Sequence, residues 1–171
     1  MTWIAPGAQP VDGPLTGPDR PIVKGYLDFE RSSLANICAG LTAEQLALRP
    51  LPSTNLSLLG IVRHLAKVER NWFRIRAAAE PAEPLFDPTL GADHDFDDGH
   101  PDQAEHDYEV WQDEIRRADE AAATYADDHE FERGGETMSL GLVYVHMVAE
   151  YARHNGHADL IREAIDGVQG R

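Results

Sequence analysis

The chain has 171 residues, of which 42% are hydrophobic and 26% are charged, as in ordinary globular domains. Its 30 acidic and 15 basic side chains give a formal net charge of −15, which disfavours nucleic acid and anionic membrane surfaces as partners. No apolar run is long enough to span a bilayer and the N-terminus lacks a signal-peptide pattern, so we expect no membrane association and a cytoplasmic location. The single cysteine, Cys38, excludes internal disulfides and thiolate metal clusters, and its place in an apolar helical pattern is typical of a core thiol.

The order of patterns along the chain predicts an all-α protein. Residues 1–18 are rich in proline and glycine, which predicts an irregular arm held to the surface by Trp3 and Ile4. Residues 19–171 are expected to form one domain, because apolar residues recur three and four apart in four long stretches. Thr42 and Gln45 have capping-box spacing, which adds a short helical turn. The predicted helices cover about 20–39, 55–79, 102–125 and 139–167, with polar connections at 80–101 and 127–137. This arrangement predicts a four-helix bundle without strands.

The long connection, residues 80–101, is expected to cross the length of the bundle. Its alternating aspartates, Asp93, Asp95 and Asp97, resemble the start of a calcium loop. A calcium loop requires a bidentate glutamate where this chain has Ala104, so we interpret the segment as a solvated acidic loop.

A carboxylate and an imidazole lie within the apolar stripe of the last helix. Glu150 and His154 are four residues apart, which places them about 40° apart on one helical face. A buried carboxylate needs compensation. It could come from a private Glu150–His154 hydrogen bond, from an arginine of another helix, or from a divalent metal that both residues hold. The apolar stripe consists of Leu140, Val143, Met147, Tyr151, Ala158, Ile161 and Ile165.

A third ligand is available on the second long helix. His64 lies at the edge of the apolar stripe of residues 55–79, and a bundle would bring it to Glu150 and His154. Two imidazoles and one carboxylate suit zinc, nickel, iron or manganese and leave coordination positions open. Alternatively, His64 could be bonded to a loop carbonyl.

Several neighbouring side chains could complete such a site. His157 could replace Glu150 as a ligand or orient His154, and His146 is expected at the rim of the pocket. Arg153 could hold a carboxylate or take part in a helix salt bridge, and the same alternatives apply to Arg162. The Asn155–Gly156 pair is expected to kink the last helix or widen one of its turns. The remaining histidines, His94, His100, His106 and His129, are expected in solvent.

Two segments, LSLLGIVRHLAKVERNWF and LVYVHMVAEYARHNGHADLIREAIDG, resemble the DinB-like superfamily of four-helix-bundle metalloenzymes. More narrowly, they resemble the branch that contains mycothiol-dependent maleylpyruvate isomerase. The resemblance implies a divalent metal held by a histidine of the second helix, here His64. It also implies an E-x-x-x-H pair in the last helix, here Glu150 and His154, followed by N-G-H-A-D-L.

The resemblance also implies a thiol-dependent enzyme. Zinc is the expected metal, with nickel or iron as alternatives, and a low-molecular-weight thiol such as mycothiol is the expected co-substrate. The metal would activate the thiol for transfer to a small-molecule electrophile or for isomerisation. His157 or His146 would move protons, Arg153 and Tyr151 would contact the substrate, and a homodimer is expected. Two alternatives are a metal-dependent hydrolase and a non-catalytic, stress-associated bundle that binds a metal or small ligand. Thiol dependence of turnover would distinguish the transferase from the hydrolase.

Overall fold

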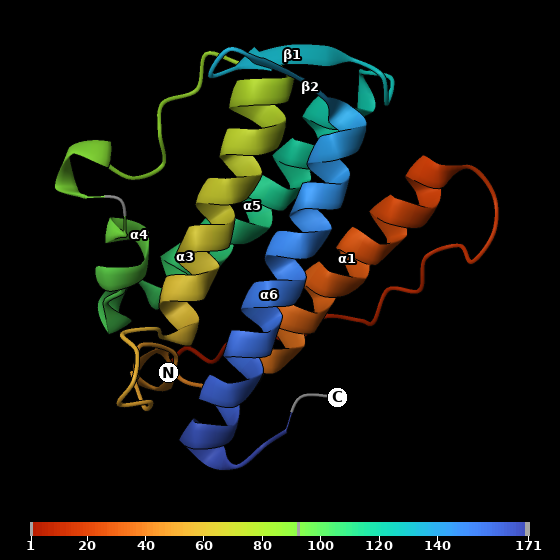
Figure 1. Cartoon of the computed structure of the whole chain (residues 1–171). Helices are drawn as coiled ribbons and strands as arrows, with labels where there is room; N and C mark the ends of the chain where they lie inside the picture. Colours follow the sequence, from red (N-terminus) through yellow and green to blue (C-terminus); the bar gives the residue numbers. More distant parts are fainter. Residues whose placement is uncertain (1, 92, 170–171) are drawn as a thin grey trace.

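Long helices dominate the computed structural model, which describes residues 2–91 and 93–169 (Figure 1). The long helices are α1 (Asp19–Cys38), α3 (Leu58–Glu69), α5 (Ala104–Ala123) and α6 (Leu140–Asp166). The prediction of an all-α bundle is confirmed. Two shorter α-helices lie in the connections, so the predicted count of four is not confirmed. The shorter helices are α2 (Ala43–Leu46) and α4 (His94–Asp97), and the 3₁₀ turns are η2 (Pro88–Leu90) and η3 (Pro101–Gln103). Thr42 caps α2 in the predicted capping box.

The chain direction explains why the long connection exists. α1 and α6 run side by side in one direction, whereas α3 and α5 run in the other (Figure 1). Hydrogen bonds at the ends agree, because Arg162 near the end of α6 donates to the carbonyl of Ile37 near the end of α1. Since α3 and α5 are parallel, residues 78–103 must return along the bundle before α5 begins. This return is the predicted crossover, and α4 lies on it, beside α3.

The second long helix changes its form partway. After Glu69 it continues as the π-helix η1 (Arg70–Ala77), whose turns are wider than those of an α-helix. The sequence predicted a kink or a widened turn at Asn155–Gly156 of the last helix. The widened turn is absent, because α6 is α-helical from Leu140 to Asp166. The wide turns of η1 alter where Trp72 and Arg76 emerge from the helix.

A β-hairpin replaces the polar connection predicted without strands. β1 (Glu130–Arg133) and β2 (Glu136–Ser139) pair antiparallel and lie across one end of the bundle (Figure 1). Gly134 and Gly135 form the turn with φ of 61° and 86°, which is the pair of positive φ values that a tight hairpin favours. Phe131 and Met138 face each other across the strands and pack on the core. The predicted absence of strands is therefore wrong for this segment.

The N-terminal arm is held mainly by its backbone. The amide of Ala5 donates to the carbonyl of Leu41 at 2.9 Å, and Ala5 itself is buried. Trp3 packs edge-on against Tyr108, as an anchor of the arm should. The side chain of the other predicted anchor, Ile4, is 54% exposed, and this residue holds the arm through an antiparallel β-bridge to Thr42 instead.

A buried polar network joins the long helices at the centre of the bundle. Glu69 of α3 is fully buried, and its carboxylate accepts hydrogen bonds of 2.8 and 2.7 Å from Arg31 of α1. The Tyr151 hydroxyl of α6 also donates to Glu69, at 2.8 Å, and accepts from Trp111 of α5 at 2.9 Å. The pairing compensates the burial of the charge. Tyr151 therefore has a structural role in place of the predicted substrate contact, since its side chain is fully buried.

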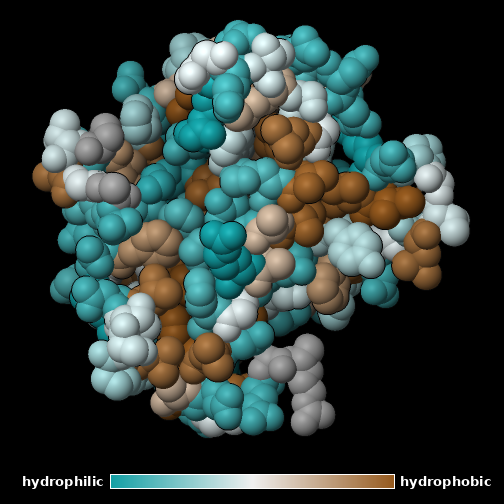
Figure 2. All heavy atoms as spheres, viewed as in Figure 1, coloured by the Kyte–Doolittle hydropathy of each residue, from teal (hydrophilic) through white to brown (hydrophobic). Residues whose placement is uncertain are grey.

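Hydrophobic side chains also remain on the surface, and Figure 2 shows them gathered on the side of the molecule formed by α1 and α6. The large exposed hydrophobic residues of these helices are Tyr26, Phe29, Leu142, Val145 and Leu160. The expected homodimer stays a prediction. Among the described residues, no helix combines the length and the hydropathy that crossing a bilayer requires.

We expect Tyr151→Phe to lower the free energy of unfolding by about 1–3 kcal/mol, because Glu69 loses a donor and the buried Trp111 loses its acceptor. Urea denaturation followed by circular dichroism measures the change. Tyr26→Phe is the matched control, since Tyr26 is exposed. Equal midpoints for the two variants would contradict the role given to the buried network.

Candidate metal centre

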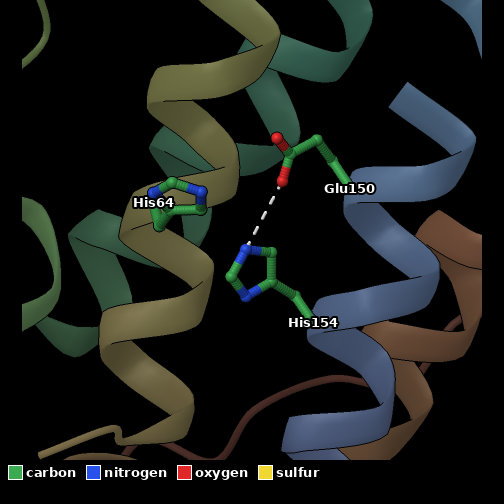
Figure 3. A group of neighbouring side chains, drawn as sticks. All are labelled: His64, Glu150 and His154. Atoms are coloured by element: carbon green, nitrogen blue, oxygen red, sulfur yellow. Dashed lines mark ion pairs between the residues drawn. The ribbon is translucent and has the colours of Figure 1, made fainter. Parts of the chain in front are cut away.

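Three side chains predicted as ligands meet between α3 and α6. His64 approaches from α3, while Glu150 and His154 approach from α6 (Figure 3). One ligand atom from each lies within 4.8 Å of the other two. Nε2 of His154 is 3.5 Å from Oε2 of Glu150, and the two imidazole rings are 4.7 Å apart between centroids. The structure thus brings together residues separated by more than eighty positions.

An aspartate that the sequence did not single out orients His64. Nδ1 of His64 is 2.8 Å from Oδ2 of Asp95, and the Lys67 ammonium is 2.5 Å from the same oxygen. Burial would raise the pKa of Asp95, but the hydrogen bonds from His64 and Lys67 hold it below its ordinary value. A charged Asp95 favours the His64 tautomer with the proton on Nδ1, which leaves the Nε2 lone pair for a metal.

Asp95 also corrects the interpretation of residues 80–101 as a solvated acidic loop. Its side chain is 1% exposed, because α4 packs closely on α3. Gly60 permits this approach, since a Cβ at that position would lie 2.6 Å from the Phe96 carbonyl oxygen. Phe96 stacks on the His64 ring with centroids 4.2 Å apart, and Arg63 donates to the Asp95 carbonyl. In the sequence, the one sign of this close helix contact was Gly60, a glycine within a strongly apolar helix.

The ligands from α6 differ in their surroundings. The Glu150 side chain is partly exposed and lies between two imidazoles, with His146 Nε2 3.4 Å from Oε1. His154 is buried. The pKa of His154 is lowered to about 4, chiefly by burial and also by electrostatic interactions with His64, His157 and Arg153, while Asp95 opposes the shift. His154 is consequently neutral near pH 7, which is the form that binds metals.

The two predicted proton carriers lie on either side of the ligand pair on α6. The His157 ring is 5.6 Å from the His154 ring, and its buried Nδ1 has no hydrogen-bond partner in the described part of the chain. The His146 ring packs 4.4 Å from Trp72. Burial lowers the pKa of His146, against the attraction of Glu150. Each imidazole thus adjoins one candidate ligand, His146 beside Glu150 and His157 beside His154.

The predicted arginines separate into two kinds. Arg153 is exposed on α6, as a substrate-binding residue could be. Arg162 instead donates to the carbonyls of Ile37 and Ala39, so it caps the end of α1. His129 was expected in solvent, but its ring bonds the Ala77 carbonyl at 2.9 Å. That expectation was wrong.

Cys38 offers no nucleophile of its own to this centre. The thiol is fully buried, and burial raises its pKa to about 12. Since the sequence has one cysteine, any thiol chemistry here must use a thiol from outside the chain.

A model of the mycothiol-S-transferase family matches residues 22–167, which is most of the chain. The chain belongs to this family. The match confirms the resemblance to the DinB-like superfamily, of which mycothiol-S-transferases are members. Neither a curated protein nor a solved structure matches the chain.

The donor set of this mycothiol-S-transferase family member fits a divalent metal. Two imidazoles and one carboxylate suit zinc or iron and leave positions open for a further ligand. Metal–ligand bonds of about 2.1 Å place tetrahedral ligand atoms about 3.4 Å apart, and the 3.5 Å between Nε2 of His154 and Oε2 of Glu150 is close to this separation. The alternative of a private ion pair is weaker. Among the described residues, no lysine or arginine lies at ion-pair distance from Glu150, and its imidazole contacts are 3.4 and 3.5 Å long.

In the metal-free protein, we expect stability to fall as the pH drops from 6.5 to about 4. Unfolded His154 takes up a proton near its ordinary pKa of 6.5, whereas the folded residue resists protonation until about 4. Its contribution is therefore complete above pH 6.5 and is lost through that window. Urea unfolding with a chelator should give a steeper acid slope for the natural chain than for His154→Gln. Parallel slopes would contradict the lowered pKa of His154. The control is His100→Gln, because the His100 side chain is exposed.

Proposed function

We propose that this protein is a divalent-metal-dependent S-transferase that uses a low-molecular-weight thiol, mycothiol, as co-substrate. The metal, zinc foremost, is held by His64, Glu150 and His154. The observation that carries the proposal is the convergence of their ligand atoms within 4.8 Å, in a chain of the mycothiol-S-transferase family. The carboxylate of Asp95 behind His64 supports it, because ligating histidines usually donate their second nitrogen to such a group.

The chemistry requires an activated thiol. A bound divalent ion would lower the pKa of a coordinating thiol, so that the thiolate is present at neutral pH. In the transfer, the thiolate sulfur forms a bond to an electrophilic carbon, and the leaving group departs with its electron pair. The proton released by the thiol passes to an imidazole of the protein.

The residues around the ligands have distinct tasks in this proposal. Asp95 keeps His64 in one tautomer and one orientation. Phe96 covers the His64 ring and limits access of water on that side. His146 and His157 are proton carriers: the pKa of His146 is lowered by burial, which leaves a neutral base, and Nδ1 of His157 is unpartnered in the described residues.

Protein purified without a histidine tag should contain close to one equivalent of divalent metal. His154→Ala should reduce the metal content below about a tenth of an equivalent, because it removes one of three protein ligands. Mass spectrometry of the metals measures both. The control is His100→Ala, whose side chain is exposed on the connection before α5. A metal content that is low and unchanged by His154→Ala would end the proposal.

Thiol dependence separates the transferase from its alternatives. With a neutral electrophile such as chloroacetamide, chloride release should require both mycothiol and the metal. Metal-dependent turnover without a thiol would indicate a hydrolase instead. A metal-loaded protein that turns over neither thiol conjugates nor water adducts would be a binding bundle.

Asp95→Asn should weaken metal affinity about 10–100-fold, because an amide no longer fixes the His64 tautomer or raises the basicity of its Nε2. Competition with a coloured chelator measures the affinity. The matched control is Asp97→Asn, an exposed position on the same short helix, which should stay within about twofold of the natural chain. Equal effects of the two substitutions on metal affinity would contradict the role of Asp95 in orienting His64.

A further inference from the structure

A cluster of cationic and aromatic side chains lies beside the candidate centre, and we call it the arginine cage. Trp72 is its platform, with the guanidinium carbon of Arg76 4.3 Å and that of Arg133 4.6 Å from the ring centroid. The His146 ring packs 4.4 Å from the same indole. The members come from η1, β1 and α6, so segments distant in the sequence assemble it.

The guanidinium groups of the cage lack anionic partners. In the described residues, no carboxylate lies at ion-pair distance from Arg76 or Arg133, although acidic residues outnumber basic ones two to one. Glu136 is the cross-strand neighbour of Arg133 in the hairpin, but no ion pair joins these two side chains. The arginines that do have such partners are Arg20, Arg31, Arg63, Arg70, Arg74, Arg116, Arg117 and Arg162.

Holding these two cations together is unfavourable unless an anion joins them. Burial, followed by the neighbouring charge of Arg133, lowers the pKa of Arg76 below its ordinary value. Contact with an indole face compensates part of the lost hydration. A carboxylate would compensate the remainder, because the planar guanidinium donates two parallel hydrogen bonds to it.

Two irregular elements create the cage. Trp72 and Arg76 belong to the π-helix η1. This conformation is rare in proteins, and where it occurs it is often at a functional site. Arg133 ends β1 beside the Gly134–Gly135 turn, and the hairpin carries it over η1. Without the hairpin and the wide turns, these side chains would not share one indole ring.

The cage adjoins the metal ligands through His146. Its Nε2 lies 3.4 Å from Glu150 Oε1, and Trp72 follows His64 by eight residues on the facing helix. Exposed Arg153 adds a third positive charge that acts on His146, together with those of Arg133 and Arg76. A small molecule held by the cage would therefore present its far end toward the centre.

We infer that the arginine cage binds the carboxylate of the electrophilic co-substrate, so that the preferred substrates are small anionic electrophiles. The identity of the bound molecule as an electrophile rests on the proposed function. The binding of a carboxylate by Arg76 and Arg133 does not, and it can be measured without thiol or turnover.

Calorimetric titration of the metal-loaded protein with succinate at physiological salt tests the cage directly. Arg76→Gln/Arg133→Gln should weaken succinate binding about tenfold or more, because two charge-assisted contacts are lost. Arg116→Gln/Arg117→Gln on α5 removes the same charge from ion-paired surface arginines and should change binding less than about twofold. Metal content and thermal midpoint, measured for each variant, exclude loss of the fold.

Several outcomes would overturn the inference. They are absence of succinate binding by the natural chain, equal losses for the two double variants, and tighter binding of inorganic phosphate than of succinate. If the metal or thiol dependence fails while the cage still binds succinate, only the proposed transfer reaction is lost. If transfer occurs, the cage variant should raise KM for chloroacetate, leave KM for neutral chloroacetamide unchanged, and leave kcat unchanged for both.

Discussion

The buried carboxylate of Glu69 is the constraint on which the geometry of the centre depends. Its hydrogen bonds with Arg31 and Tyr151 tie α3 to α1 and α6. A carboxylate buried at this depth has no contact with water, so it depends on these two partners. Glu69 follows His64 on α3, and Tyr151 follows Glu150 on α6. The contact that satisfies the charge therefore also fixes the helix spacing at which His64 can face Glu150.

The centre combines a rigid half with an adaptable half. His64 is fixed by the bond to Asp95 and by stacking on Phe96, whereas Glu150 is partly exposed and lies between two imidazoles without a short hydrogen bond. A fixed imidazole can set the position of an ion, and a carboxylate without a short hydrogen bond can adjust as a further ligand enters. This division suits a site that must exchange one of its ligands.

The convergence of His64, Glu150 and His154 could be predicted because it depends on local periodicity. Four-residue spacing puts Glu150 beside His154 in any helix, and a bundle needs little more to bring up a histidine of the facing helix. Asp95 could not be chosen among three similar aspartates, because the choice depends on how closely α4 packs at Gly60. Tyr151 was misassigned because its apolar position concealed a hydroxyl bonded across the core. The hairpin and the π-helix escaped prediction because eight residues distinguish poorly between competing periodicities.

The position of α4 on the crossover connection has a consequence for the whole segment. Only when α4 is docked can Asp95 and Phe96 hold His64, so a metal that prefers the oriented imidazole also prefers the docked helix. Thermodynamic reciprocity then requires that occupancy of the centre and the ordering of residues 93–99 strengthen each other by the same free energy. If the proposed metal binds, the long return loop would thus report its occupancy, and amide hydrogen exchange could detect this far from the candidate ligands of α6.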